Sequence, residues 1–357
     1  MDDRAAMQRA LDLAWSGWGH VGPNPLVGAL VLRGGDVVGE GCHAEFGGPH
    51  GEVIALHEAG ERARGADLVV TLEPCRHSGK TPPCTDAIVR AGIRRVIYGA
   101  ADVDPAARGG AEVLRERGLA VDAGLMADEV RRQNALFFHR HAVPERPFVA
   151  LKVAQSLDGR SADRERRSQW ITGPQARAHV HWLRAGFDAI AVAAGTALAD
   201  DPALTVRGPL VPRRPPLRVL FDRRGEVPVS ARLLATARET PTLVVAGLGV
   251  SAEHRRAVEA SGAALLVADD YSAALAALRA RGVAALLVEG GGVLAGRLLA
   301  ADLVDRVYAF VAPLFLGAES VPALGAFAGG ALADVRRWTV AERRSLGQDH
   351  LFVLDRT

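Results

Sequence analysis

The sequence predicts an α/β protein built from two domains. Its 357 residues are more than twice the average domain length of about 150 residues. In both halves, short apolar runs of strand length alternate with segments of helical periodicity, as in sheets covered by helices. The stretch 142–147 interrupts this alternation with two prolines and reads as a linker. We therefore expect domains at 1–143 and 147–357.

The first half is expected to alternate strands and helices after a short amphipathic helix. Gly60 and Gly92 would stop its two later helices. The expected elements are a helix at 4–16, a hairpin of 26–32 with 37–38, a helix at 50–59, a strand at 68–72, a helix at 84–91 and a strand at 93–98. Sites in such folds usually lie where strands end and helices begin.

The second half repeats this alternation without an internal repeat that links it to the first. Expected strands are 148–154, 189–193, 217–221, 242–246, 264–267, 284–288 and 306–311, with helices at 174–185 and 271–281. Gly290, Gly291 and Gly292 follow a strand and open an apolar helix at 293–301. Such a turn lets backbone amides approach a phosphate, but a tight turn without a ligand fits equally well.

The polar residues of the second half indicate a function less specifically. A loop at 196–202 carries Asp200 and Asp201, which a capped turn would also explain. Four arginines are candidates for holding phosphates: Arg184, Arg207, Arg223 and Arg224. The chain has 43 Lys and Arg residues, and only two of them are Lys, so 41 are Arg. With so many arginines, most are expected on the solvated surface.

The most specific pattern is a candidate catalytic zinc site in the first half. His50, Cys75 and Cys84 offer one imidazole nitrogen and two thiolates, which leaves a fourth zinc position for water. Glu52 follows His50 by two residues, and residues at this spacing do not share a helix face. We therefore place the metal at a helix N-terminus, which also favours thiolates.

The arrangement H-x-E followed by P-C-x-x-C is the signature of zinc nucleobase deaminases, in which the Glu moves protons. Here eight residues, not two, separate Cys75 from Cys84. The alternative is a structural zinc knuckle, with Cys42, His43 or His77 as the fourth ligand. A knuckle would give Glu52 no role, and its cysteines usually lie two to four residues apart.

Composition excludes several classes of protein. A net charge of +2 and 5% aromatic residues do not provide the basic stripe and stacking surface of a nucleic-acid binder. No apolar run approaches the roughly 20 residues that span a bilayer, and Met1–Leu13 lacks the apolar core of a signal peptide. Three cysteines give no disulfide framework and fit a reducing cytoplasm.

Lysine occurs only at Lys80 and Lys152. In a chain that otherwise uses arginine, these two positions suggest a need for a compact ammonium whose pKa can shift. Chance placement remains the alternative for either lysine.

Longer stretches carry a specific resemblance over nearly the whole chain. In the first half they are NPLVGA at 24–29, GCHAEFGGPHGEV at 41–53 and TLEPCRHSGKTPPCTD at 71–86. In the second they are KVAQSLDGR at 152–160, SQWITG at 168–173, GT at 195–196, DDPALTVR at 200–207 and EGG at 289–291. Together they resemble the bifunctional deaminase/reductase family of riboflavin biosynthesis. The eight-residue spacing between the two cysteines is part of that family's pattern. Gly51 departs from the pattern, because the family more often has Ala at this position.

The resemblance implies a cytidine-deaminase-like three-layer domain at 1–143 and a dihydrofolate-reductase-like domain at 147–357. It implies zinc-dependent deamination of a diaminopyrimidinone ribosylamine 5′-phosphate, then NADPH-dependent reduction of its ribose to a ribityl chain. The expected partners are these small pyrimidine ribosyl phosphates, not nucleic acid or membrane, and we expect a homo-oligomer, a dimer or a tetramer.

The resemblance also assigns residues, with Glu52 as the deaminase proton shuttle. Deaminase substrate contacts would be Asn24, His43, His77 and Lys80. NADPH would lie near Ala154, Trp170, Thr196, Asp200, Gly290, Gly291 and Gly292, and the sugar phosphate near Ser168, Arg184, Leu204, Arg207 and Glu289. Asp200 and Lys152 are the candidate catalytic proton donors of reduction, with Asp200 preferred.

Two rival functions predict different features. A deaminase of free bases or RNA, with the second half as a structural module, predicts a basic groove with stacking aromatics. A zinc-stabilised binding protein predicts a filled fourth zinc position.

Overall fold

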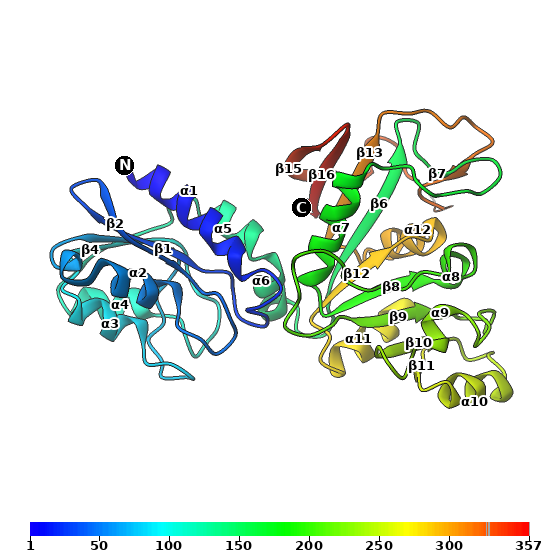
Figure 1. Cartoon of the computed structure of the whole chain (residues 1–357), viewed down its shortest axis with the longest axis horizontal. Coiled ribbons are helices and arrows are strands. Elements are labelled where there is room, and N and C mark those ends of the chain that lie inside the picture. The colour runs from blue at the N-terminus through cyan, green and yellow to red at the C-terminus, as the bar shows by residue number, and fades with distance from the viewer. Residues whose placement is uncertain (326, 328, 357) are drawn as a thin grey trace. The chain divides into compact units, whose positions relative to one another are not determined.

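The computed structural model describes residues 1–325, 327 and 329–356. The chain divides into two compact units, Met1–Ala142 and Val143–Thr357. Each unit has its own sheet and its own helices (Figure 1), and each is described by itself below.

The first unit is a three-layer sandwich around a five-stranded sheet of order β2-β1-β3-β4-β5. The β1–β2 and β1–β3 pairs are antiparallel, whereas β3, β4 and β5 run parallel. The strands are β1 (Gly28–Arg33), β2 (Asp36–Cys42), β3 (Asp67–Leu72), β4 (Arg95–Ala100) and β5 (Ala120–Ala123). Gly34 and Gly35 both have positive φ, at 61° and 91°, which suits the two-residue hairpin turn between β1 and β2.

Helices cover both faces of this sheet. In Figure 1, α1 and α5 lie on one side of it and α2, α3 and α4 on the other. The helices are α1 (Asp3–Ala14), α2 (Gly51–Ala59), α3 (Cys84–Arg90), α4 (Gly110–Glu116), α5 (Ala127–Gln133) and α6 (Ala135–Ala142), with 3₁₀ turns at Trp15–Gly17 and Gly60–Ala63. One continuous core joins α1, α2 and the central strands.

The second unit is organised on a nine-stranded sheet of order β11-β10-β9-β8-β12-β6-β13-β16-β15. From β11 to β13 the neighbouring strands are parallel, and β16 and β15 add an antiparallel hairpin at one edge. The strands are β6 (Phe148–Ser156), β8 (Ala189–Ala193), β9 (Leu217–Phe221), β10 (Thr242–Ala246), β11 (Ala264–Val267), β12 (Ala285–Glu289), β13 (Arg306–Ala312), β15 (Trp338–Leu346) and β16 (Asp349–Arg356), beside a separate pair of β7 (Arg160–Ala162) and β14 (Val321–Pro322).

The buried strands send alternate side chains into two different cores. On one face, Ala191 and Val219 pack with α11 and α12; on the other, Val192 and Leu220 pack with α8, α9 and α10. The helices are α7 (Pro174–Ala185), α8 (Ala194–Asp200), α9 (Arg232–Ala235), α10 (Ala252–Ala260), α11 (Tyr271–Ala280) and α12 (Gly292–Ala300). Near-continuous apolar runs are typical of parallel strands covered on both faces.

The α/β class is confirmed, and every strand and helix named from the sequence is present. One detail is wrong: residues 196–200, expected in a loop, belong to helix α8, and only Asp201 and Pro202 follow it. The β15–β16 hairpin was not anticipated. Within the described residues, no helix has the length and apolar character needed to cross a bilayer.

Candidate functional site

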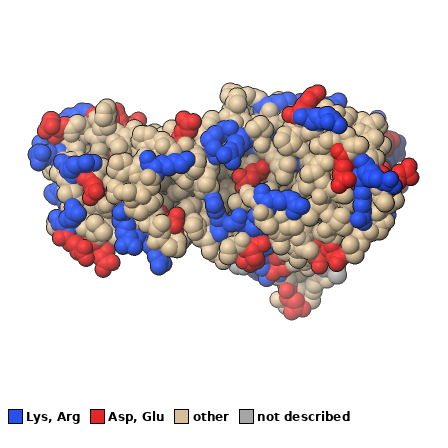
Figure 2. Space-filling model, turned by 90° about the horizontal axis from the view of Figure 1, so that it is seen from below, with Lys and Arg blue, Asp and Glu red and all other residues tan. Residues whose placement is uncertain are grey.

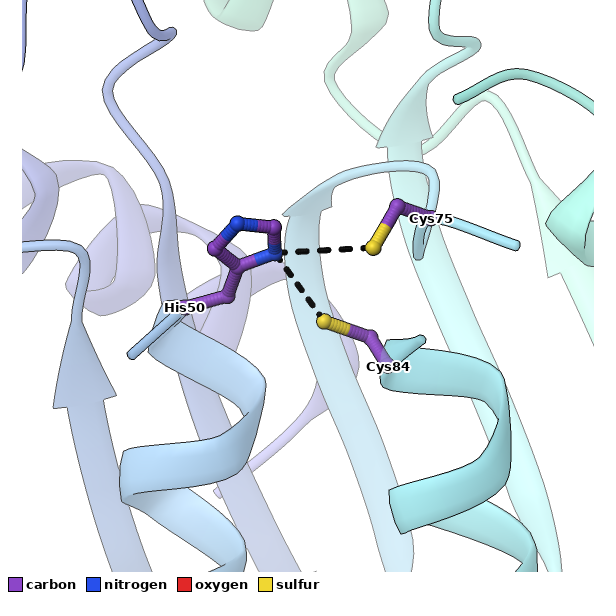
Figure 3. Close-up of side chains that lie close together, drawn as sticks. All are labelled: His50, Cys75 and Cys84. Atoms are coloured by element: carbon purple, nitrogen blue, oxygen red, sulfur yellow. Dashed lines mark hydrogen bonds between the residues drawn. The ribbon is translucent and has the colours of Figure 1, made fainter. Parts of the chain in front are cut away.

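The three expected zinc ligands meet at one point of the first unit (Figure 3). His50 is the N-cap of α2, Cys84 is the first residue of α3, and Cys75 lies in the loop after β3. His50 Nδ1 lies 3.1 Å from Cys84 Sγ and 3.5 Å from Cys75 Sγ. Two helix N-termini and one strand end therefore bring together ligands from distant parts of the chain.

This cluster fits zinc. With Zn–N near 2.0 Å and Zn–S near 2.3 Å, a tetrahedral centre separates nitrogen from sulfur by about 3.5 Å. A hydrogen bond from Cys84, then one from His50, lowers the pKa of Cys75 to about 4 despite its burial, so this sulfur is a ready thiolate. Within the described residues, none of Cys42, His43 and His77 joins the cluster, which argues against a four-ligand knuckle.

Glu52 lies in the first turn of α2 and is 3% exposed. Burial raises the pKa of its carboxyl group. Its Oε2 atom is enclosed without a hydrogen-bond partner in the described part of the chain. A carboxyl group with a raised pKa and a free oxygen is suited to proton transfer, whereas a structural carboxylate would be fully bonded.

A cavity of about 330 Å³ opens on this centre and brings together the residues expected around the deaminase substrate. Asn24, His43, His77 and Lys80 all line it, together with His50, Glu52 and Cys75. The Lys80 ammonium lies 3.9 Å from the centre of the Phe46 ring. The loop between the two cysteines thus carries His77 and Lys80 to the cavity.

His43 differs from the other three in being almost fully buried, at 2% exposure. Its Nδ1 lies 3.0 Å from the carbonyl oxygen of Pro49, so Nδ1 carries the proton. Its Nε2 then accepts from Asn24 Nδ2 at 3.1 Å. Because both ring nitrogens are engaged, His43 orients the amide of Asn24.

Sequence reasoning missed other residues of this cavity. Asp102 lines it, and burial raises the pKa of its carboxyl group to about 6. Arg140 and His141, at the end of α6, form part of its wall. These positions belong to no sequence motif. The fold of the unit brings Asp102, which follows β4, and Arg140 and His141, which lie in α6, to the same cavity.

The sequence analysis also missed Glu73, whose side chain holds the loop of the site in place. Its Oε1 accepts hydrogen bonds from the backbone of Gly109 and Ala111 at 3.1 and 3.0 Å. Its Oε2 accepts from the backbone of Asp102 at 3.1 Å. Glu73 therefore anchors the chain two residues before Cys75 to the start of α4. The signal available in the sequence was an acidic residue placed directly after a buried strand.

The second unit holds a separate cavity of about 850 Å³. It is lined by every residue expected to serve reduction: Lys152, Ala154, Ser168, Trp170, Arg184, Thr196, Asp200, Leu204, Arg207, Glu289, Gly290, Gly291 and Gly292. These residues come from strands β6 and β12, helices α7, α8 and α12, and loops, and they are as much as 140 positions apart in the sequence.

A buried charge cluster forms part of this cavity. Lys152 on β6 stands opposite Glu289 on β12 in the parallel register. Arg184 binds Glu289 in a bidentate pair, with distances of 2.5 and 2.9 Å, and donates to the carbonyl oxygen of Thr205 at 2.7 Å. Burial lowers the pKa of Lys152, opposed by the carboxylate of Glu289. Glu289 is thus ion-paired with Arg184 and also acts electrostatically on Lys152.

The glycine turn at 290–292 and helix α8 form another part of the cavity wall. Gly290 and Gly291 have φ of 71° and 81°. A Cβ atom on Gly291 would lie 3.0 Å from Ala193 Cβ and 3.3 Å from the Thr196 hydroxyl. Glycine therefore permits both the backbone conformation and the close approach of α8. Ser168 donates to Asp200 Oδ1 at 2.9 Å.

Both halves of the chain match known protein families. Residues 1–100 match the cytidine and deoxycytidylate deaminase zinc-binding region, and residues 147–352 match the RibD C-terminal domain. The riboflavin biosynthesis protein RibD of Aquifex aeolicus is 41% identical over 321 residues, covering 88% of each chain. The chain belongs to the RibD family. RibD of Escherichia coli is 38% identical over 371 residues and 98% of each chain.

Solved structures agree over the whole length. A diaminohydroxyphosphoribosylaminopyrimidine deaminase/5-amino-6-(5-phosphoribosylamino)uracil reductase from Thermotoga maritima is 34% identical, with a TM-score of 0.83 and 99% of each chain covered. RibD of Acinetobacter baumannii is 33% identical, with a TM-score of 0.82 and the same coverage. The expected family is confirmed. As a RibD protein, the chain is a bifunctional deaminase and reductase, so neither rival function stands.

Proposed function

We propose that this RibD protein deaminates 2,5-diamino-6-ribosylamino-4(3H)-pyrimidinone 5′-phosphate in its first domain, 1–143. Its second domain, 147–357, then reduces the ribosyl group of the product, 5-amino-6-(5-phosphoribosylamino)uracil, to ribityl with NADPH. The observation that carries this proposal is the pair of separate cavities, one beside the His50, Cys75 and Cys84 cluster and one beside Lys152 and the glycine turn. The two reactions named for the Thermotoga maritima relative need these two kinds of site.

In deamination, His50, Cys75 and Cys84 hold the metal. When bound, zinc supplies a Lewis acid that lowers the pKa of a water to about 7. Glu52, buried with a free oxygen, takes one proton from the attacking water and gives it to the ring nitrogen; it then carries the remaining hydroxyl proton to the amine, which leaves as ammonia. Asn24, oriented by His43, and the loop residues His77 and Lys80 hold the substrate.

In reduction, the glycine turn at 290–292 with Thr196 would hold the pyrophosphate of NADPH, since no side chain blocks backbone amides there. NADPH supplies a hydride to the opened ribose. The sugar phosphate would lie near Ser168, Arg207 and the Arg184–Glu289 pair.

Burial changes our choice of proton donor. The pKa of Lys152 is lowered, which makes its ammonium a better acid. Asp200 instead accepts a hydrogen bond from Ser168. We therefore favour Lys152 over Asp200.

We further propose a cytoplasmic homo-oligomer, a dimer or a tetramer. The three cysteines are free, and the two at the metal cluster must stay reduced to serve as ligands. Phe315 and Leu332, at 76% and 84% exposure, are candidate contacts of the subunit interface. Light scattering of the purified protein measures the oligomer directly.

The proposal is tested by assaying ammonia release and NADPH oxidation in one reaction, starting from the diaminopyrimidinone phosphate. We expect one ammonia per NADPH oxidised at completion and a ribityl product by mass spectrometry. Ammonia release without any NADPH oxidation would remove the proposed second activity.

A further inference from the structure

Helix α7 fixes the backbone of the loop that follows α8. His181 and Arg184 are three positions apart on α7 and therefore lie on the same side of the helix. The Arg184 guanidinium donates to the carbonyl oxygen of Thr205 at 2.7 Å. The backbone N–H of Arg207 donates to His181 Nδ1 at 3.1 Å. Two side chains of one helix therefore hold a backbone carbonyl and a backbone N–H of the same short segment.

This segment directly follows a residue whose conformation needs support. Leu204 has a φ of 49°, a left-handed value that a bulky residue rarely adopts. Its side chain is buried in the same core cluster as Val192 and Leu220. Such backbone conformations persist only where the surrounding structure holds them, and they cluster at ligand sites. The two contacts from α7 come directly after Leu204 and so fix the path of the chain beyond it.

The segment matters because of where Arg207 lies. Arg207 lines the second cavity, whereas His181 is not part of the described cavity lining. Among the described residues, no carboxylate forms an ion pair with the Arg207 guanidinium, so this group is available to an anion. A guanidinium matches phosphate oxygens with paired donors. His181 therefore acts on the cavity through Arg207 and not by touching a ligand.

His181 is held in the neutral form that this contact requires. A backbone N–H can only donate, so Nδ1 carries a lone pair and the proton of the neutral ring lies on Nε2. Burial, followed by the positive charges of Arg184 and Arg207, lowers the pKa of His181 to about 4. At neutral pH the imidazole therefore accepts the Arg207 N–H and adds no third positive charge beside the two arginines.

We propose that His181 is a positioning residue of the reductase site, which places the Arg207 guanidinium and thereby sets the affinity for the 5′-phosphate of the substrate. The proposal rests on the proposed reductase function and assigns part of its phosphate specificity to a residue outside the cavity. Arg184 holds the same segment but also pairs with Glu289, so its loss would disturb two contacts. His181 isolates the positioning effect.

The test is steady-state reduction of 5-amino-6-(5-phosphoribosylamino)uracil by the full chain. The same compound without its 5′-phosphate is compared as an alternative substrate and as a competitive inhibitor. His181→Leu replaces the acceptor with a side chain of similar size. The KM for the phosphorylated substrate should rise roughly 3- to 10-fold, the net contribution of one hydrogen bond. The kcat and the KM for NADPH should stay close to the wild-type values, which also shows that the site is folded.

The dephosphorylated compound should bind His181→Leu as well as it binds the wild type, because it has no phosphate for Arg207 to hold. His181→Ala gives the same prediction if the leucine variant is unstable. His181→Asn is the conservative variant, since its amide oxygen can take the place of Nδ1, and it should restore most of the affinity. Arg207→Ala should raise the same KM, and adding His181→Leu to it should cause little further loss, because both changes remove the same contact.

His179→Leu is the matched control. His179 lies on the same helix, and burial also lowers its pKa to about 4. Its ring instead contacts Trp182 and Phe310, with centroid distances of 5.1 and 6.1 Å. Its replacement should leave the KM for the phosphorylated substrate unchanged.

Three results would overturn the assignment while leaving the reductase function intact. They are an unchanged KM in His181→Leu, equal losses for the phosphorylated and dephosphorylated compounds, and additive losses in the double variant. A wild-type protein that did not reduce the phosphorylated compound would overturn the reductase function itself, and the assignment with it.

Discussion

Under the proposed mechanism, burial prepares Glu52 and Lys152 for proton transfer. Burial raises the pKa of the Glu52 carboxyl group and lowers that of the Lys152 ammonium. In both cases burial disfavours the charged form of the side chain. The pKa of each group therefore shifts toward the neutral range, where general acids and bases transfer protons efficiently. The two groups belong to different units of the chain.

Glu52→Gln should keep the metal but lose most deamination. The amide preserves the size of the side chain but cannot carry the proton, and loss of a general acid–base typically costs about 10²- to 10⁴-fold in rate. Metal content by mass spectrometry and ammonia release decide the matter. Loss of zinc together with activity would instead make Glu52 a ligand, and an unchanged rate would remove its role altogether.

Lys152→Ala and Lys152→Arg should both impair reduction and spare ammonia release. Arginine keeps the charge but does not release a proton, so it should be nearly as damaging as alanine. In the wild type, the donor must be protonated. Because its pKa is lowered, reductase kcat should fall with rising pH below the ordinary lysine value of about 10.4.

Lys80 provides the reciprocal control for Lys152. Lys80→Ala should slow deamination and leave reduction of the deaminated product untouched, because Lys80 lines the first cavity. Full reductase activity in Lys152→Arg would show that only a positive charge is needed there.

At the level of elements, the metal site depends on how strand ends meet helix starts. Cys84 begins α3, His50 caps α2, and Glu73 ties the loop that carries Cys75 to the start of α4. Removing the carboxylate of Glu73 would leave three backbone N–H groups without their acceptor. The bond to Ala111 is buried, and an unsatisfied buried group of this kind costs about 1–3 kcal/mol.

Glu73→Ala should therefore lower both the melting temperature and the zinc affinity of the first domain. Glu73→Gln is the matched control, because its amide oxygen retains one acceptor, and it should fall between the alanine variant and wild type. Zinc competition with a chromophoric chelator and thermal unfolding measure the two effects. If Glu73→Ala bound zinc as tightly as the wild type, the loop would be held by other contacts.

The sequence was most informative where side chains are buried on both sides of a strand. Apolar runs such as 189–193 and 242–246 predicted their strands, and the residue types of His50, Cys75 and Cys84 predicted the cluster that the structure brings together. It failed for β15, where Glu342, Arg343 and Arg344 leave no apolar face to recognise. Contacts assembled by topology, such as that of His181 with the backbone of Arg207, have no signature in the spacing of their residues.

At the level of the whole molecule, each unit carries its own cavity with the residues that we propose for one of the two reactions. Among the described residues, the lining of the first cavity ends at His141, and the lining of the second begins at Leu151. On the face shown in Figure 2, basic and acidic side chains are interspersed, which suits small substrates better than a nucleic acid.

Fragments 1–143 and 147–357 should therefore fold and work separately. The first should bind zinc and release ammonia; the second should reduce the deaminated product without zinc. Circular dichroism and the two half-reaction assays test this. Insolubility of both fragments would indicate that the domains depend on a shared core.

The most direct measurement of the central claim, two independent sites in one chain, is metal removal from the full-length protein. The chain is treated with a zinc chelator, and each half-reaction is then assayed with its own substrate. We predict that ammonia release is abolished and returns when zinc is added back, while reduction of 5-amino-6-(5-phosphoribosylamino)uracil by NADPH continues at the untreated rate. Loss of both activities with zinc, at unchanged folding of the second domain, would contradict the claim.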